Sequence, residues 1–126
     1  MKKFKISLEL PWPDKVLNPN DHHTHWSKKA EAAREAKQYA YYYTLSQGHG
    51  QALEGRKKYK LKQSITFHPP DRRTRDDDNF LKALKPTRDG IFMALASDDK
   101  YIRKTVIEWG EVVPYGKVTI ILEEML

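Results

Sequence analysis

The feature that most limits how this chain can fold is an alternation of apolar and polar residues in two short segments that end at proline. Every second residue from Phe4 to Leu10 is apolar, and Pro11 follows. A similar alternation runs from residue 58 to 67, and Pro69 follows it. A period of two sends successive side chains to opposite sides of a strand. The two segments therefore predict strands of a sheet that buries one face.

A long helical pattern, from Lys28 to Gln47, lies between these segments. Ser27 is a suitable N-cap for its first turn, and Gly48 follows its last turn. Residues at helical spacing form one face, made of Ala33, Ala36, Ala40 and Tyr43. We expect Tyr43 to lie in the core with these alanines, while Tyr41 and Tyr42 point elsewhere and could line a dimer interface.

The rest of the chain predicts a second helix and two more strands. An apolar helical pattern starts at Phe80, is kinked or divided by Pro86, and resumes from Ile91 to Leu95. Two strands follow on either side of a turn, Ile102 to Val112 and Lys117 to Leu122. The order is β-α-β-α-β-β. Because 126 residues suit one domain, we expect a single α/β domain of the α+β type over residues 1–126, with a mixed sheet and two main helices.

The composition excludes several classes of protein. The chain has no cysteine, which excludes a disulfide framework, a thiolate nucleophile and a cysteine zinc site. No apolar stretch approaches the length needed to cross a bilayer. We therefore expect a cytoplasmic protein without a membrane partner.

The chain is basic overall but acidic in one segment. Lys and Arg number 23 and Asp and Glu 17, which gives a formal net charge of +6. A basic balance favours a polyanionic partner such as DNA, and so an association with the nucleoid. Seven of the nine aspartates nevertheless lie between Asp71 and Asp99. An acidic cluster on a basic chain needs an explanation.

The densest acidic run extends from Asp76 to Asp78. On an extended backbone these two carboxylates point to the same side. If a helix starts near Asn79, Lys82 lies one turn beyond Asp78 on the same face. The run therefore predicts two converging carboxylates with a lysine beside them.

A second acidic pair, Asp98-Asp99, could return to the same edge of the sheet after the apolar helix. Carboxylates held close together repel one another unless a divalent cation binds among them, and oxygen ligands favour Mg²⁺ or Mn²⁺. The alternative is that the acidic run is solvated and only caps a helix.

Basic side chains lie near the acidic run and along the second strand. Three arginines beside the acids are expected to contact DNA phosphates: Arg72, Arg73 and Arg75. Three lysines share one face of the predicted strand: Lys58, Lys60 and Lys62. The lysines fit either phosphate binding or a solvated edge strand that avoids aggregation.

The polar loop before the first helix contains three histidines, His22, His23 and His25. They could form an imidazole metal site, supply a general base, contact the DNA backbone or lie on the surface.

These motifs together resemble a known family. The segment from Pro70 to Leu84, with its Asp76-x-Asp78-Asn79-x-x-Lys82 core, is followed by the apolar run from Gly90 to Leu95 and by Asp98-Asp99. Leu10-Pro11-Trp12-Pro13 and His25-Trp26-Ser27 add to the pattern. In order and spacing this resembles the signature of the RusA family of Holliday junction resolvases, over most of the chain. Pro86 departs from it, since the family builds a longer helix there.

The resemblance implies a small homodimeric α/β endonuclease that needs Mg²⁺, with Mn²⁺ as a substitute, and cuts four-way junction DNA by paired symmetric nicks. It implies that Asp76, Asp78 and Asp99 bind the metal, with Asp98 as the alternative to Asp99, and that Lys82 is the essential basic residue. Two other functions stay open. One is a nuclease that acts on other branched DNA or on RNA, and the other is a DNA-binding module without catalysis.

Overall fold

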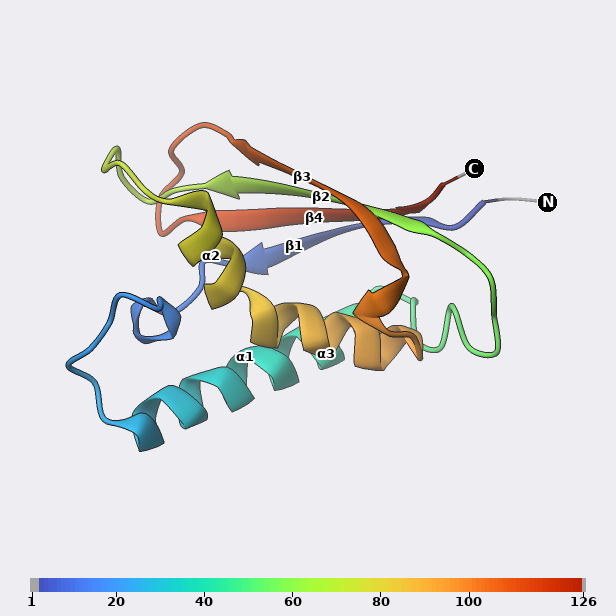
Figure 1. Cartoon of the computed structure of the whole chain (residues 1–126), viewed down its shortest axis with the longest axis horizontal. Coiled ribbons are helices and arrows are strands. Elements are labelled where there is room, and N and C mark those ends of the chain that lie inside the picture. The colour runs from blue at the N-terminus through green and yellow to red at the C-terminus, as the bar shows by residue number, and fades with distance from the viewer. Residues whose placement is uncertain (1–2, 126) are drawn as a thin grey trace. The chain divides into compact units, whose positions relative to one another are not determined.

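Four strands form one mixed sheet, β1 (Lys5–Pro11), β2 (Leu61–His68), β3 (Ile102–Trp109) and β4 (Lys117–Glu124). The structure is a computed structural model that describes residues 3–125. The strands lie in the order β1-β4-β2-β3 (Figure 1). Both β1 and β2 pair with β4 in the antiparallel sense, whereas β2 and β3 are parallel. The predicted α+β class, the mixed sheet and the element order are confirmed.

The chain divides into two compact units. Within the described residues, the sheet unit comprises residues 3–12, 56–73 and 99–125 and contains all four strands. The helical unit comprises residues 13–55 and 74–98 and contains the three α-helices. The expectation of one domain over residues 1–126 stays a prediction.

One face of the sheet is buried through residues that lie opposite one another in neighbouring strands. Leu8 pairs with Ile120, which also pairs with Ile65, and all three are at most 1% exposed. A one-residue slip of any strand would turn its apolar residues to the other face, so this row fixes the register. Pro11 belongs to β1 instead of ending it, because β1 is an edge strand where a missing N–H is tolerated.

The helical unit contains α1 (Trp26–Ser46), α2 (Asp77–Ala83) and α3 (Lys85–Leu95). Pro86 lies in the first turn of α3, where its missing N–H has no intrahelical partner to lose. The division of the second helix at Pro86 is therefore confirmed, although α3 begins at Lys85 and not near Ile91. Within residues 3–125, none of the helices combines the length and apolar character that a membrane span requires.

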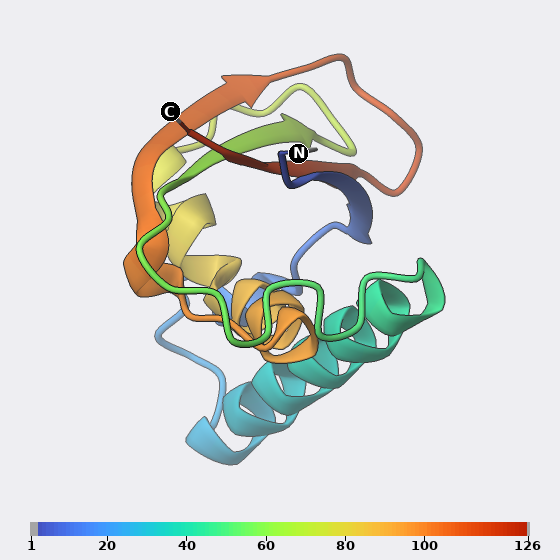
Figure 2. The ribbon, with the colours of Figure 1, turned by 90° about the vertical axis from the view of Figure 1, so that its right-hand side faces the viewer.

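Helices α1 and α3 lie side by side, and Gly90 of α3 lies close to the backbone of α1 (Figure 2). A Cβ atom added to Gly90 of α3 would clash with the backbone carbonyl of Lys37 and lie 3.1 Å from the Cβ of Ala40. Ala40 and Thr44 are the buried residues of α1. Tyr43 is only half-buried, so its predicted place in the core is wrong. Contact this close leaves room for small side chains and not for a phenol ring.

We expect Gly90→Ala to lower the free energy of unfolding by about 1–3 kcal/mol, because overpacking against a fixed backbone outweighs the better helix propensity of alanine. Urea denaturation measures this change. Gly50→Ala is the matched control, since its added Cβ would meet only the end of the flexible Leu45 side chain. An equal effect of both substitutions would contradict a backbone contact at Gly90.

An ion pair in the sheet unit connects Arg56 to Glu124, the last residue of β4. Arg56 Nη2 donates to Glu124 Oε1 at 2.8 Å, and the Phe4 amide donates to the same oxygen at 3.3 Å. The pKa of Glu124 is lowered, chiefly by the hydrogen bond from Arg56 and next by the bond from Phe4. Both interactions favour the ionised carboxylate.

This pKa shift predicts how stability depends on pH. A carboxyl group whose pKa is lower in the folded state stabilises the fold above its unfolded pKa, about 4.3 for glutamate, and loses that effect as the pH falls through the folded pKa. We expect wild type to be more stable than Glu124→Gln near neutral pH, and the difference to shrink as the pH falls below about 4. Urea unfolding of both proteins across this range is the measurement. A difference that does not change with pH would show that Glu124 acts through packing instead of charge.

Candidate functional site

Asp76 caps the helix that carries the predicted acidic site. Its Oδ1 accepts hydrogen bonds from the amides of Asp78 at 2.8 Å and Asn79 at 3.4 Å. Asp76 has extended backbone angles, and α2 begins at the next residue, Asp77. The helix therefore starts two residues before the predicted position near Asn79. An aspartate at this place satisfies free amides and carries a negative charge at the positive end of the helix.

The early helix start changes how the carboxylates relate to each other. Asp76 is extended but Asp78 is helical, so the alternation expected for an extended run does not apply. The backbone amide of Asp78 donates to the capping carboxylate of Asp76, whereas the carboxylate of Asp78 is exposed and has no part in the cap. Lys82 is exposed in the last turn of α2, four residues after Asp78, as predicted. The exposed face of α2 thus combines a carboxylate and an ammonium group one turn apart.

Asp99 lies at the other end of the sheet from Asp71. It opens a 3-10 turn, η2 (Asp99–Tyr101), directly before β3, and Tyr101 stacks on Tyr59 near the start of β2 with ring centroids 4.2 Å apart. Asp71 follows the end of β2. Because β2 and β3 are parallel, both begin at the same end, and eight residues of strand, about 26 Å, separate the two ends. Asp99 and Asp71 therefore lie at opposite ends of the sheet, and the expected return of Asp99 to the edge that carries Asp76 and Asp78 stays a prediction.

The predicted metal ligands are divided between the two units. Asp76 and Asp78 belong to the helical unit, and Asp99 belongs to the sheet unit. Across residues 3–125, no three His, Asp or Glu side chains are grouped so that they could hold a metal ion. Metal binding by these residues stays a prediction.

Two of the three predicted DNA-contacting arginines have intramolecular contacts. Arg73 forms a bidentate pair with Asp71, with Nη2 at 2.9 Å from Oδ2, and this hydrogen bond raises the pKa of Arg73. The guanidinium of Arg75 lies over the Phe80 ring, 6.0 Å from its centroid. Arg72 is exposed. The charge of Arg73 is therefore balanced locally, whereas Arg75 is held at the start of α2.

The three predicted lysines do not form a stripe on one strand. β2 begins at Leu61, so Lys58 and Lys60 lie in the preceding connection, where Lys58 has a positive φ of 59°. Lys62 is on β2, opposite Glu123 of β4. Since β2 lies between β4 and β3, the interpretation of these lysines as a solvated edge strand is also wrong.

His25 has a structural role that the sequence pattern did not reveal. Helix α1 begins at Trp26, and its N-cap is His25 and not Ser27. His25 Nδ1 accepts a hydrogen bond from the Ser27 amide at 3.2 Å and lies 2.8 Å from its hydroxyl. His22 and His23 are exposed in the loop before the helix. Capping therefore uses one ring nitrogen of His25 as a hydrogen-bond acceptor.

Asp21 organises the same loop. Its Oδ1 accepts from the His23 amide at 3.2 Å, and its Oδ2 lies 3.9 Å from the Lys29 ammonium. Lys29 also donates to the backbone carbonyl of Asp21. The pKa of Asp21 is lowered, chiefly by a side-chain hydrogen bond from Thr24. In an Asx turn the side chain of an aspartate accepts a hydrogen bond from the backbone amide two residues later. The turn at Asp21 could therefore have been predicted from the sequence.

Comparison with known proteins finds a similar chain. No protein-family model matches the sequence. A protein of Xylella fastidiosa, described as an uncharacterized protein, is 42% identical over 118 residues, which cover 90% of this chain and 73% of that protein. The similarity therefore extends through both the sheet unit and the helical unit.

The cap at Asp76 has a direct test. We expect Asp76→Ala to lower the free energy of unfolding by about 1 kcal/mol, because two amides of α2 lose their acceptor, whereas Asp76→Asn, which keeps a capping oxygen, has a much smaller effect. Urea denaturation compares the two variants. Equal stability of Asp76→Ala and wild type would contradict the cap.

Proposed function

We propose that this chain, which belongs to one family with the Xylella fastidiosa protein, is a Mg²⁺-dependent, structure-selective endodeoxyribonuclease that resolves Holliday junctions. The observation that carries the proposal is the exposed Asp78 and Lys82, one turn apart on α2, directly after Arg75 and Asp76. The reaction itself comes from the resemblance to the RusA family. Hydrolysis of a phosphodiester needs groups of both charges, a carboxylate for a metal and a cation for the phosphate.

The donor atoms of Asp76 and Asp78 suit Mg²⁺, or Mn²⁺ in its place, because both cations prefer carboxylate oxygens. Each carboxylate has two oxygens, so a cap at Oδ1 of Asp76 is compatible with a cation at its other oxygen. When bound, the cation would activate water and offset charge on the scissile phosphate. Asp76 and Asp78 both belong to the helical unit and carry the proposed ligand set, whereas metal binding by Asp99 of the sheet unit stays a prediction.

The basic residues have distinct roles in this proposal. Lys82 stabilises charge that develops on the phosphate, because α2 fixes it one turn from Asp78. Arg72 and Arg75 bind the flanking phosphates, and the net charge of +6 favours approach to DNA and association with the nucleoid. Arg73 contributes less, because Asp71 already balances its charge.

The proposed enzyme acts in the cytoplasm as a homodimer. A four-way junction offers two strands at symmetry-related positions, and one copy of this chain supplies one α2 site. A twofold symmetric pair would present two sites at once, as paired nicking requires.

A second function, a DNA-binding module without catalysis, is favoured by the cap. The Oδ1 of Asp76 is used to stabilise α2, and residues 3–125 contain no three acidic or histidine side chains grouped around a possible metal position. In this case the acidic run only begins a helix, and the basic residues bind DNA.

Cleavage of labelled substrates distinguishes the two functions. We expect wild type to nick a four-way junction in Mg²⁺ and not in EDTA, and to act much less on linear duplex or RNA. Asp78→Asn should reduce nicking at least about 100-fold while junction binding persists, since a metal ligand is lost but a negative charge near DNA is removed too. The substitution leaves the cap intact because Asp78 supplies only its amide there.

Asp77→Asn is the matched control, because Asp77 is the neighbouring carboxylate in the same helical turn. It should retain nicking. Junction binding without nicking by wild type would favour the non-catalytic module, and preferred cleavage of RNA or of other branched DNA would change the substrate class. Equal activity of Asp78→Asn and Asp77→Asn would reject the metal site at Asp78.

A further inference from the structure

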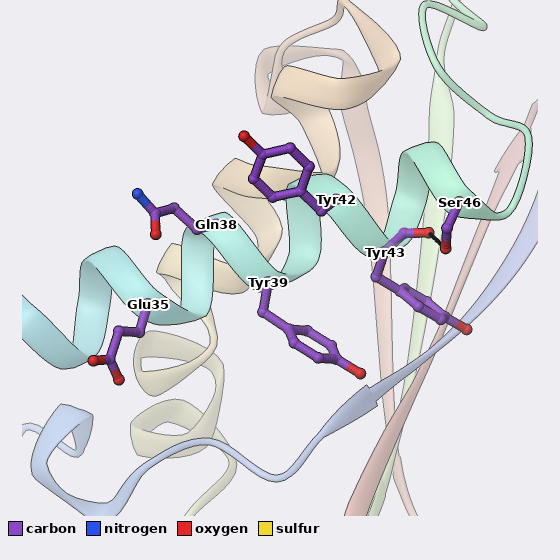
Figure 3. A pocket seen from close by; sticks show the side chains of 6 residues that line it. All are labelled: Glu35, Gln38, Tyr39, Tyr42, Tyr43 and Ser46. Atoms are coloured by element: carbon purple, nitrogen blue, oxygen red, sulfur yellow. Dashed lines mark hydrogen bonds between the residues drawn. The ribbon is translucent and has the colours of Figure 1, made fainter.

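Exposed tyrosines occur in both units of the chain, but they are arranged differently. On α1 of the helical unit they line an open groove, where Figure 3 shows Tyr39 and Tyr43 on one side of the helix and Tyr42 pointing away from them. In the sheet unit, Tyr115 lies in the connection from β3 to β4 and is 93% exposed. Packing within the fold therefore does not explain the side chain of Tyr115.

The backbone at Tyr115 is strained. The Gly116 amide donates to the Val113 carbonyl at 3.0 Å, which closes a turn with Pro114 and Tyr115 at its centre. Tyr115 has a φ of 65°, in the left-handed region that glycine or asparagine usually occupies at this place in a turn. A bulky side chain in this region costs stability, and among residues 3–125 no other aromatic residue has a positive φ. Strain of this kind points to a role outside the fold.

The turn that carries Tyr115 is fixed to the rest of the sheet unit. The Val113 amide donates to the carbonyl of Pro69, just beyond β2, at 3.0 Å. A Cβ atom added to Gly116 would lie 3.0 Å from three side-chain atoms of Trp12, so the glycine lies directly against the indole. Because these contacts hold the backbone in place, a ligand that stacks on the Tyr115 ring need not order the turn first.

The surroundings of Tyr115 favour a flat ligand over a protein surface. Across residues 3–125, Val112, at 43%, is the only other large apolar side chain of the sheet unit that is exposed. Two such side chains are too few for the core of a stable protein interface, which buries about 800 Å² on each partner. One ring is enough to stack on a nucleobase, because every base has an aromatic face.

The proposed function identifies the nucleic acid that carries this base. Arg72, which is proposed to bind a flanking phosphate, lies three residues after Pro69, to which the turn of Tyr115 is hydrogen-bonded. The neighbouring acid, Asp71, is paired with Arg73. A cation for the phosphate and an aromatic ring for the base are the two parts of a surface that binds unpaired nucleic acid. A four-way junction offers such bases at its branch point, where the arms separate.

We propose that Tyr115 stacks on a nucleobase at the branch point of the DNA. The choice of DNA rests on the proposed function, but the measurements below require binding and not cleavage. The turn between β3 and β4 would then contact a base, in addition to the phosphate contacts of the arginines.

Binding of a four-way junction in EDTA, where no strand is cut, tests the stacking. Tyr115→Leu keeps an apolar side chain without an aromatic face, and we expect it to raise the dissociation constant at least about 10-fold. Tyr115→Phe keeps the ring and should bind like wild type. Val112→Ala is the matched control, because it removes the other exposed apolar side chain of the same connection, and it should also bind like wild type.

A fluorescent base analogue reports the contact directly. The probe is the same junction with 2-aminopurine, whose fluorescence is quenched by stacking, beside the branch point. We expect the saturated complex of Tyr115→Leu to be at least about twice as bright as that of wild type. A linear duplex with 2-aminopurine in its interior should not distinguish the two proteins, since its bases are already covered on both faces.

The outcomes separate this inference from the proposed function. Equal affinity and equal fluorescence of wild type and Tyr115→Leu would overturn the inference, even if wild type nicks the junction in Mg²⁺. Weaker binding by Tyr115→Leu together with no nicking by wild type would support the inference and reject the nuclease. If Tyr115→Leu binds DNA normally but sediments with a lower mass than wild type, the turn contacts a protein and the inference fails.

Thermal unfolding tests the strain at Tyr115. Tyr115→Asn should raise the Tm by about 3 °C, because asparagine tolerates a positive φ, and should weaken junction binding as Tyr115→Leu does. Tyr115→Phe should leave the Tm unchanged, since it keeps a bulky ring at the same φ. A Tm of Tyr115→Asn at or below the wild-type value would contradict the strain from which the proposal starts.

Discussion

The parallel pairing of β2 with β3 is the constraint on which the rest of the structure depends. Two parallel neighbours cannot be joined by a hairpin, so the chain must leave the end of β2 and return to the start of β3. Residues 69–101 make this return and contain α2 and α3. The seven clustered aspartates all lie in this connection. An acidic segment that is compact in the sequence is therefore spread along a crossover, with Asp71 at one end of the sheet and Asp99 at the other.

The same connection shows how one residue type can serve a helix and a site. Asp76 is the N-cap of α2. Because the helix begins at Asp77, the side chains of Asp78 and Lys82 lie one helical turn apart. Because the cap takes the amide of Asp78 and not its carboxylate, Asp78 remains exposed on the same helical face as Lys82. A short helix of seven residues needs such a cap, since it has few hydrogen bonds of its own. The carboxylate of Asp76 would therefore have to cap the helix and bind a metal, whereas the carboxylate of Asp78 has no part in the cap.

Charge is distributed unevenly along α1, and the close contact with α3 explains part of this pattern. Gly90 of α3 lies against the backbone at Lys37 and the side chain of Ala40, which leaves room only for a small residue at Ala40, whereas Tyr39 and Tyr42 are exposed. The face of α1 that contacts α3 thus carries small residues, and the exposed face carries tyrosines. Lysines, arginines and glutamates of the helix all lie between residues 28 and 37.

The sequence by itself determined the features that depend on neighbouring residues. Period-two alternation located β1 and most of β2, and Pro86 divided the second helix, because side-chain direction and the missing proline N–H act within a few residues. Lys82 could likewise be placed one turn after Asp78. Only the tertiary structure decided what depends on distant partners. The start of β2 at Leu61, which removed Lys58 and Lys60 from the strand, follows from its pairing with β3 and β4. The placement of Ala40 and not Tyr43 in the core depends on which residues α3 contacts, and the position of Asp99 at the opposite end of the sheet from Asp71 follows from a parallel pairing that no local pattern encodes.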